Sequence, residues 1–347
     1  MSNKRSYNLF IFFVMFGFLS CRKDKPADKI KPNIMIQQGG VFISNEGNFQ
    51  FGNAKISYYN PSENSISEDV FETANNRPLG DVCQSVCFYN SKAYVVVNNS
   101  GKIEVVNEKT FVSTAIINGF VSPRYFLPVS NAKAFVTDLY TNKIYVVDLT
   151  TNQISGNIPV GGWCEEMAMV YGKVFITSKE GNYLYVADAI NDLLIDSIQI
   201  GFSSNSIVQD KNAKLWVLCD GNQTNSIYPS LHRINPANHM VEQSFQFSSI
   251  NDAPWRLKLN GSADTLYFLN KGVYKMSILE NTIPLQPFIS SSGSNFYGLG
   301  VNPENSEIYV SDAIDYVQKG QIYRYKSSGS LMNTFKAGII PSDFYFR

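Results

Sequence analysis

The chain has 347 residues, of which 44% are hydrophobic and 14% are aromatic. This length suits about two average domains or one large all-β domain, and the apolar content is sufficient for a sizeable core. The 29 basic residues balance 29 acidic ones, so the sequence lacks the excess of positive charge expected of a nucleic-acid-binding protein. With two histidines and no Cys-x-x-Cys pair, it also offers almost no ligands for a zinc site.

The first 20 residues have the features of a signal peptide. Lys4 and Arg5 precede an apolar run at 9–19, which Ser20 and Cys21 follow. The cysteine at the cleavage point resembles the signal of bacterial lipoproteins, which implies that Cys21 becomes a lipid-modified first residue. A plain secretory signal is the alternative. Residues 21–38 are predicted to be a flexible tether that carries the lipid anchor.

One short pattern recurs seven times along the rest of the chain. Each copy has an aromatic residue among alternating apolar residues, then a polar break, as in VFISNEG from Val41 and AFVTDLY from Ala134. The repeated aromatic residues lie 40 to 52 positions apart and are Phe42, Tyr94, Phe135, Phe175, Trp216, Tyr267 and Tyr309. This period is typical of propeller blades with four strands each. Trp216 occupies this repeated position, so we expect it in the core.

The ends of the chain predict how the ring closes. A further apolar strand precedes six of the seven aromatic positions, as in EMAMVYG before Phe175, but none precedes Phe42. The missing strand is PSDFYFR at 341–347, which has nothing after it. We therefore predict an all-β fold over 39–347, a seven-bladed β-propeller with four-stranded blades. Its C-terminal strand pairs within the N-terminal blade and removes open sheet edges.

Two stretches resemble known families. NKIYVVDLTTNQISGNIPVGG resembles the YVTN repeat of YncE-like seven-bladed propellers, and this similarity covers 39–347. FISNEGNFQFGNAKISYYNP followed by NNRPLGDVCQSV resembles surface lipoproteins of Bacteroidetes, including BtuG-type cobalamin-binding propellers. The resemblance implies a lipid-anchored outer-membrane protein at the cell surface. It would capture a corrinoid for a TonB-dependent transporter; the sequence leaves a periplasmic orientation open.

In a propeller, the loops that enter the inner strands share one face with the loops that join the second and third strands. The first set is 77–84, 119–125, 161–166, 202–206, 252–256, 294–297 and 340–343, and the second is 45–52, 98–101, 138–142, 178–182, 220–230, 270–271 and 312–319. Binding sites commonly lie on such converging loops. The aromatic candidates are Phe49, Phe51, Tyr125, Tyr140, Trp163, Tyr228, Trp255, Phe296, Tyr297 and Tyr316. The polar candidates are Glu46, Arg77, Asp81, Arg124, Glu165, Glu166, Asn205, Arg256 and Asp343.

This mixture of aromatic and polar groups suits a large, partly polar ligand. A corrinoid, or another large small molecule, is the first hypothesis. A protein or glycan partner at the cell envelope is the second, and a carboxylate-dependent lyase or hydrolase is a distant third. The competing interpretation of each aromatic residue is that it packs one blade against the next.

The sequence favours binding over catalysis, without a cofactor or a metal. Glu165 and Glu166 are adjacent on a predicted strand, so we expect one to face the channel and the other the neighbouring blade, not a close catalytic pair. Neither His232 nor His239 lies in the loops above, which leaves a nucleophile without a histidine base. The cysteines after Cys21 are expected to be buried or half-buried thiols.

Overall fold

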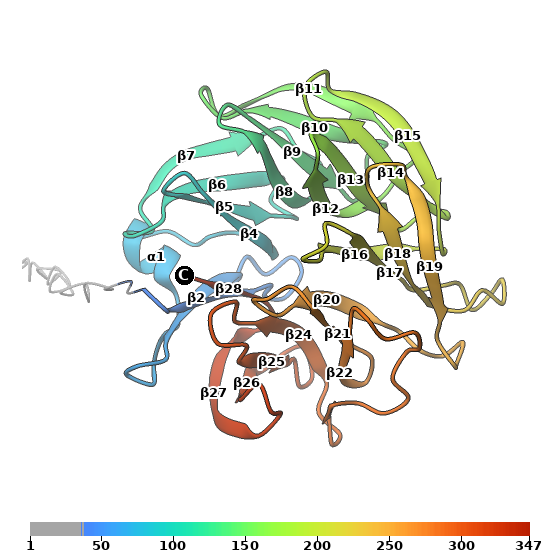
Figure 1. Ribbon diagram of the computed structural model, residues 1–347. Coiled ribbons are helices and arrows are strands. Elements are labelled where there is room, and N and C mark those ends of the chain that lie inside the picture. The colour runs from blue at the N-terminus through green and yellow to red at the C-terminus, as the bar shows by residue number, and fades with distance from the viewer. Residues whose placement is uncertain (1–35, 37) are drawn as a thin grey trace, which may run out of the picture. The chain divides into compact units, whose positions relative to one another are not determined.

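The strands of the chain form seven antiparallel sheets of four strands each. The computed structural model describes residue 36 and residues 38–347 (Figure 1). From the innermost to the outermost strand, the first blade is β28 (Pro341–Phe346), β1 (Val41–Asn45), β2 (Lys55–Asn60) and β3 (Ser65–Ser67). The predicted signal peptide and the lipidation site Cys21 lie outside the described residues.

The other six blades follow in chain order, and each again runs from its innermost to its outermost strand. They are β4 (Cys83–Tyr89), β5 (Lys92–Val97), β6 (Lys102–Asn107) and β7 (Ser113–Asn118); β8 (Pro123–Ser130), β9 (Lys133–Asp138), β10 (Lys143–Asp148) and β11 (Gln153–Pro159); β12 (Cys164–Val170), β13 (Lys173–Ser178), β14 (Tyr183–Asp188) and β15 (Leu193–Gln199); β16 (Ser204–Gln209), β17 (Leu215–Cys219), β18 (Ser230–Asn235) and β19 (Met240–Gln246); β20 (Trp255–Leu259), β21 (Thr265–Leu269), β22 (Gly272–Ser277) and β23 (Ile289–Ser290); and β24 (Phe296–Val301), β25 (Ile308–Asp312), β26 (Lys319–Tyr325) and β27 (Leu331–Ile339). The predicted seven-bladed β-propeller is confirmed.

The core of the described residues lies between neighbouring blades. Seven clusters of buried apolar side chains each join two blades. The repeated aromatic residues are among the largest buried side chains of these clusters, and none of the seven exposes more than 2% of its surface. Trp216 is fully buried and packs against Phe245 of its own blade, and its cluster includes Phe268 of the next blade. Burial of these rings at one position per blade holds the blades together.

The two ends of the described chain meet in the first blade, as predicted. β28 pairs antiparallel with β1 and places Phe344 opposite Ile43. The hydroxyls of Ser44 and Ser342 are 3.0 Å apart, which adds a side-chain contact between the two strands. Figure 1 shows the C-terminal strand among the blue strands of the N-terminal blade. This pairing leaves the first blade with four strands like the others.

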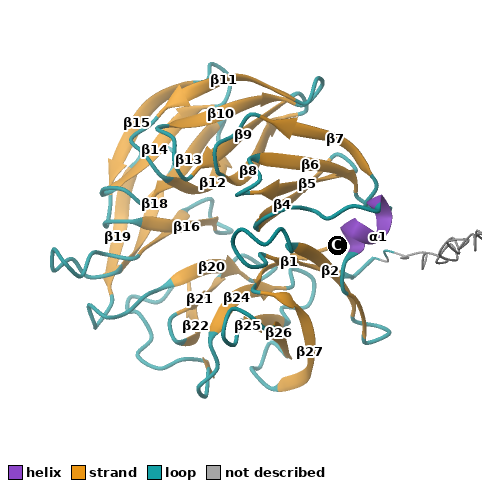
Figure 2. Ribbon diagram, turned by 180° about the vertical axis from the view of Figure 1, so that it is seen from behind, coloured by secondary structure: helices purple, strands orange, loops and turns teal. Residues whose placement is uncertain are grey.

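Two outer strands are shorter than the pattern suggests, and one helix was not predicted. β3 has three residues and β23 has two. After β3 the chain forms α1 (Val70–Asn75), the one helix among the described residues (Figure 2). Asp69 caps it by accepting a hydrogen bond from the Glu72 N–H, and Phe71 anchors it in the core. Six residues are too few for a helical periodicity to show in the sequence.

The four cysteines of the propeller have the predicted environments. Cys83, Cys164 and Cys219 are buried, Cys87 is half-buried, and all four are free thiols. Among the residues that the structure describes, no helix is both long enough and apolar enough to cross a membrane.

Ring closure gives the first prediction. Deletion of 341–347 removes the inner strand of the first blade, together with the buried Phe344 side chain. We expect the truncated chain to lose its cooperative thermal transition and to aggregate, because β1 loses its hydrogen-bonded partner strand and the interface between the last and first blades loses Phe344. A synthetic peptide of residues 341–347 should restore the transition. The prediction is wrong if the truncated protein melts like the full-length chain by circular dichroism.

Candidate functional site

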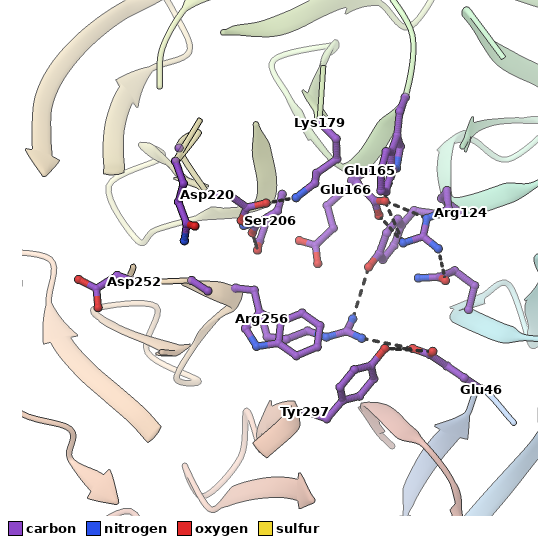
Figure 3. Close-up of a pocket in the computed structure, with 18 residues that line it drawn as sticks. Glu46, Arg124, Glu165, Glu166, Lys179, Ser206, Asp220, Asp252, Arg256 and Tyr297 are labelled. Atoms are coloured by element: carbon purple, nitrogen blue, oxygen red, sulfur yellow. Dashed lines mark hydrogen bonds and ion pairs between the residues drawn. The ribbon is translucent and has the colours of Figure 1, made fainter. Parts of the chain in front are cut away.

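All seven blades contribute to one open cavity of about 640 Å³ at the entrance of the central channel. Its lining residues lie at the start of inner strands or in the loops on that side (Figure 3). They are Glu46, Gln84, Arg124, Tyr125, Trp163, Glu165, Glu166, Lys179, Asn205, Ser206, Asp220, Gly221, Gln223, Asp252, Ala253, Trp255, Arg256 and Tyr297. The cavity size is in the range typical of small-molecule sites.

A shift of strand register near the start of every inner strand orients part of this lining. In six blades the inner strand slips against its neighbour between Cys83 and Ser85, Pro123 and Phe126, Cys164 and Met167, Ser204 and Ser206, Trp255 and Lys258, or Phe296 and Gly298. The first blade slips at Ser44 and Asn45, opposite Ser342. Such bulges re-aim side chains. The residues skipped in the six blades include Gln84, Arg124, Glu165, Asn205, Arg256 and Tyr297, all of which line the cavity.

One side of the cavity carries an ion pair stacked beside a tryptophan. Arg124 Nε and Nη2 donate to the two carboxylate oxygens of Glu165 at 2.9 and 3.1 Å. Trp163 donates its indole N–H to the same carboxylate, and the Arg124 guanidinium lies 5.9 Å from its ring centre. Arg124 also donates to Gln84. These contacts leave the Trp163 side chain fixed at the cavity wall.

A second polar cluster lies on the adjacent wall. Lys179 forms an ion pair with Asp220, and its ammonium lies 5.8 Å from the Trp163 ring centre. Asn205 donates to Asp220 and to the Pro254 carbonyl, the latter at 2.9 Å. Arg124 and Lys179 therefore both lie close to the Trp163 ring, and each of these cations is paired with a carboxylate.

Arg256 lies on the opposite side of the cavity, beside two aromatic rings (Figure 3). Its guanidinium is 4.9 Å from the Trp255 ring centre and 6.0 Å from that of Tyr297. The Tyr297 hydroxyl donates to Glu46, whose carboxylate is 3.8 Å from Arg256 Nη2. Figure 3 shows Arg256 and Glu46 converging below the cavity centre. Burial raises the pKa of Glu46, while Arg256 opposes that rise.

Glu166 lies near the centre of the site, where two cavities meet. It lines the main cavity and a second one of about 230 Å³ deeper in the channel. Burial raises its pKa to about 7; Lys258 opposes this rise and Asp343 adds to it. The expectation that only one of Glu165 and Glu166 faces the channel is wrong. The register shift from Cys164 to Met167 lets both line the cavity.

Comparison with known proteins identifies the family. The model of a family described as a domain of unknown function, DUF5074, matches residues 39–346. The chain therefore belongs to the DUF5074 family. No curated protein matches its sequence.

Several solved structures share the fold of this DUF5074 chain. A quinonprotein alcohol dehydrogenase-like protein from Bacteroides thetaiotaomicron is 16% identical with a TM-score of 0.70, over 89% of this chain and 78% of that one. A functionally unknown protein from Desulfotomaculum acetoxidans is 12% identical with a TM-score of 0.66, over 89% and 98%. Hydrazine synthase from Kuenenia stuttgartiensis is 13% identical with a TM-score of 0.58, over 73% and 85%. At these identities, the likeness concerns the fold alone.

The structure brings ten of the predicted site residues together in this DUF5074 cavity. They are Glu46, Arg124, Tyr125, Trp163, Glu165, Glu166, Asn205, Trp255, Arg256 and Tyr297. Asp343 lines the deeper cavity instead. All of the lining residues fall within the loop ranges predicted from the sequence.

Other predicted site residues lie elsewhere. Phe49, Phe51, Tyr140 and Tyr228 are exposed on loops and do not line the cavity. Tyr316 is exposed too, but its ring lies 5.8 Å from that of Tyr297.

The remaining three have structural partners away from the cavity. Arg77 forms two hydrogen bonds of 2.8 Å with Glu104. Asp81 accepts a hydrogen bond from the Gln50 N–H at 2.7 Å. Phe296 packs against Tyr323. Arg77 and Phe296 thus have partners outside the cavity, whereas one carboxylate oxygen of Asp81 is buried without a partner among the described residues.

Eight residues of the lining were not among the predicted site residues. They are Gln84, Lys179, Ser206, Asp220, Gly221, Gln223, Asp252 and Ala253. Lys179 and Asp220 are the most informative, because their ion pair bridges two neighbouring blades. Both lie in loops that join the second and third strands of a blade. Their position within the repeat could therefore have predicted that they line the cavity.

The described residues contain no group of three or more His, Cys, Asp and Glu side chains that could hold a metal ion. His232 is buried in β18, where its Nε2 accepts a hydrogen bond from the Gly201 N–H at 2.9 Å, and burial lowers its pKa to about 4. It does not line the cavity.

The two adjacent glutamates give the second prediction. The pKa of Glu166 exceeds that of an ordinary carboxyl, so its ionisation destabilises the fold as pH rises from about 4.5 to 7. Glu166→Gln should therefore raise the free energy of unfolding at pH 8 by about 2 kcal/mol, and the gain should vanish near pH 4.5.

Glu165→Gln is the matched control. It deprives Arg124 of its carboxylate partner, so we expect a loss of stability at pH 8. Urea titrations at both pH values measure these effects. A loss of stability for Glu166→Gln at pH 8, equal to that of Glu165→Gln, would contradict the assignment.

Proposed function

We propose that this DUF5074 propeller is a non-catalytic binding module that holds a large, partly polar small molecule in the cavity at its channel entrance. The observation that carries the proposal is the convergence of all seven blades on one open cavity of about 640 Å³. Two tryptophans and two tyrosines line it among hydrogen-bonding groups. Rigid aromatic surface with a few fixed polar groups is the usual composition of a ligand site.

The pairing of charges inside the cavity supports binding. Glu165 is held by Arg124 and Asp220 by Lys179, so these carboxylates serve to position their neighbours. The side chains are thus fixed before a ligand arrives, which lowers the entropy cost of binding.

We propose a corrinoid as the ligand. Trp163 and Trp255 line the cavity and offer apolar surface to a macrocycle. Asn205, Gln223 and Glu166 offer partners for its amide arms. The resemblance to BtuG-type lipoproteins supports the same ligand. On that resemblance we also propose a lipid anchor at Cys21 in the outer membrane, with a TonB-dependent transporter as partner.

A second candidate is a protein or glycan partner that covers the rim of the cavity. Phe51 and Tyr140 expose 77% and 73% of their surfaces on loops of the same face. Exposed aromatic residues on the rim of a cavity favour a macromolecular contact.

Binding of cyanocobalamin gives the third prediction. Trp163→Ala and Trp255→Ala should each weaken its binding by about 2 kcal/mol, because each removes an aromatic anchor. Tyr140→Ala, which alters an exposed ring outside the cavity, should leave the affinity unchanged. Isothermal titration calorimetry measures the three affinities, and thermal melts measure stability.

Three other results would contradict the corrinoid proposal. No heat of binding across a panel of corrinoids rules out this ligand class. If both tryptophan variants lose about 3–5 kcal/mol of stability and bind like the wild type, the rings only pack the blades. Capture of a protein or glycan on the same face, without small-molecule binding, would favour the second candidate.

A further inference from the structure

Arg256 differs from the other buried or half-buried arginines of the propeller. Arg77, Arg124 and Arg324 each form two hydrogen bonds of 2.8–3.1 Å with one carboxylate, and half-buried Arg233 forms one of 3.2 Å. Arg256 is the most buried of these five, with 6% of its surface exposed, yet it has no carboxylate within hydrogen-bonding distance. A guanidinium has five N–H donors, and burying them unpaired is costly.

The contacts of Arg256 are long or missing. Nη1 donates to the Tyr125 hydroxyl at 3.4 Å. Nη2 is 3.8 Å from Glu46 and Nη1 is 3.9 Å from Asp343, both beyond hydrogen-bonding distance. Nε is buried and has no partner among the described residues. Two carboxylates thus balance the charge of Arg256 without using its donors.

The backbone and the rings hold Arg256 in this position. Its φ is +57°, and it is the one non-glycine residue of the cavity lining with a positive φ. Residues other than glycine are disfavoured in that conformation, which persists only where the surrounding structure holds the backbone in it. The register shift between Trp255 and Lys258 turns Arg256 toward the cavity. The Trp255 ring stacks beside its guanidinium, so the donors stay in a fixed plane.

The charges around Arg256 restrict what it can receive. Glu46, Asp343 and Glu166 lie around it, and the main cavity has five carboxylates against three cationic side chains. A carboxylate or phosphate would enter against these acidic groups. A neutral acceptor would meet no such repulsion.

Glu166 provides the complementary partner. Within the described part of the chain, its side chain has one hydrogen bond, from the Ile207 N–H at 3.2 Å. Its free acceptor capacity faces the cavity that Arg256 also lines. A primary carboxamide could thus accept from Arg256 through its oxygen and donate from its NH₂ group to a carboxylate.

We propose that Arg256 is the anchor of a carboxamide subsite, in which the guanidinium binds the amide oxygen and Glu46 or Glu166 accepts the amide N–H. This inference rests on the proposed function, because it requires that the cavity binds a ligand. It adds the chemical group that the ligand presents to the cavity floor, which is the part of the lining around Arg256 and Glu46. The ligand can be a corrinoid or another amide-bearing molecule.

Three probes of equal shape and different charge test the subsite. Benzamide, benzoate and benzamidine are titrated into the full chain, and their dissociation constants are measured by ligand-observed NMR at pH 7.5. We expect benzamide to bind more tightly than the other two. Arg256→Gln should weaken benzamide by at least about tenfold, because a charge-assisted hydrogen bond is lost. Arg256→Lys, which keeps the charge but loses the planar fork, should also weaken it.

Arg324→Gln is the matched control. Its guanidinium pairs with Glu307 outside the cavity, so benzamide binding should not change. Thermal melts establish that each variant is folded. If Arg256→Gln does not fold, the wild-type ranking of the probes and the Arg256→Lys result decide.

Each contrary outcome overturns the subsite. Tighter binding of benzoate would assign an anion, and tighter binding of benzamidine a cation. Binding of none of the probes, or benzamide binding that is equal in the wild type and the folded Arg256 variants, rejects the role of Arg256. Failure of cyanocobalamin alone, with benzamide behaving as expected, rejects the corrinoid and leaves the carboxamide subsite in place.

Discussion

The pairing of β28 with β1 is the constraint on which the rest of the propeller depends. Seven apolar interfaces join neighbouring blades, and the last of them packs Tyr309 against Phe344 of the C-terminal strand. Because each blade packs against both of its neighbours, loss of the C-terminal strand would weaken the interface that joins the last blade to the first. Closure therefore does more than protect an edge. It fixes the seven strand starts around a common centre, and only then can their side chains share a cavity.

The register shifts turn this common centre into a site. Without these register shifts, every second residue of each inner strand would point toward the channel. The pairing with the neighbouring strand would then determine which residues these are. A shift near each strand start frees one or two residues from that alternation. At the fourth blade it brings both Glu165 and Glu166 to the cavity, and at the sixth it brings Arg256. The same local device, repeated once per blade, thus gathers groups that are about forty residues apart in the sequence.

The sequence predicted the fold more completely than the site for a physical reason. Blade number, the buried Trp216 position and the strand of 341–347 all follow from alternation and repetition, which hydrophobic burial imposes. The loops around the cavity followed from the topology. Which side chain of a loop faces inward depends on the register shifts, and these leave no trace in the apolar pattern. The opposite orientations expected for Glu165 and Glu166 were wrong for this reason, and Lys179 was missed because its partner Asp220 lies on another blade.

The distribution of charge in the cavity is the physical basis of the proposed preference for a neutral amide over an ion. Arg124 and Lys179 have carboxylate partners at short range, so neither has strong attraction left for an anion. The floor has Arg256, which is surrounded by Glu46 and Asp343 at nearly equal distances. The charge of Arg256 is compensated, but its N–H donors lack close acceptors. Both can be true because Coulomb attraction falls slowly with distance, whereas a hydrogen bond requires close contact. A site with compensated charge and free donors selects for dipolar groups. A ligand that carries several carboxamides around an apolar body would satisfy the floor and the tryptophan walls together.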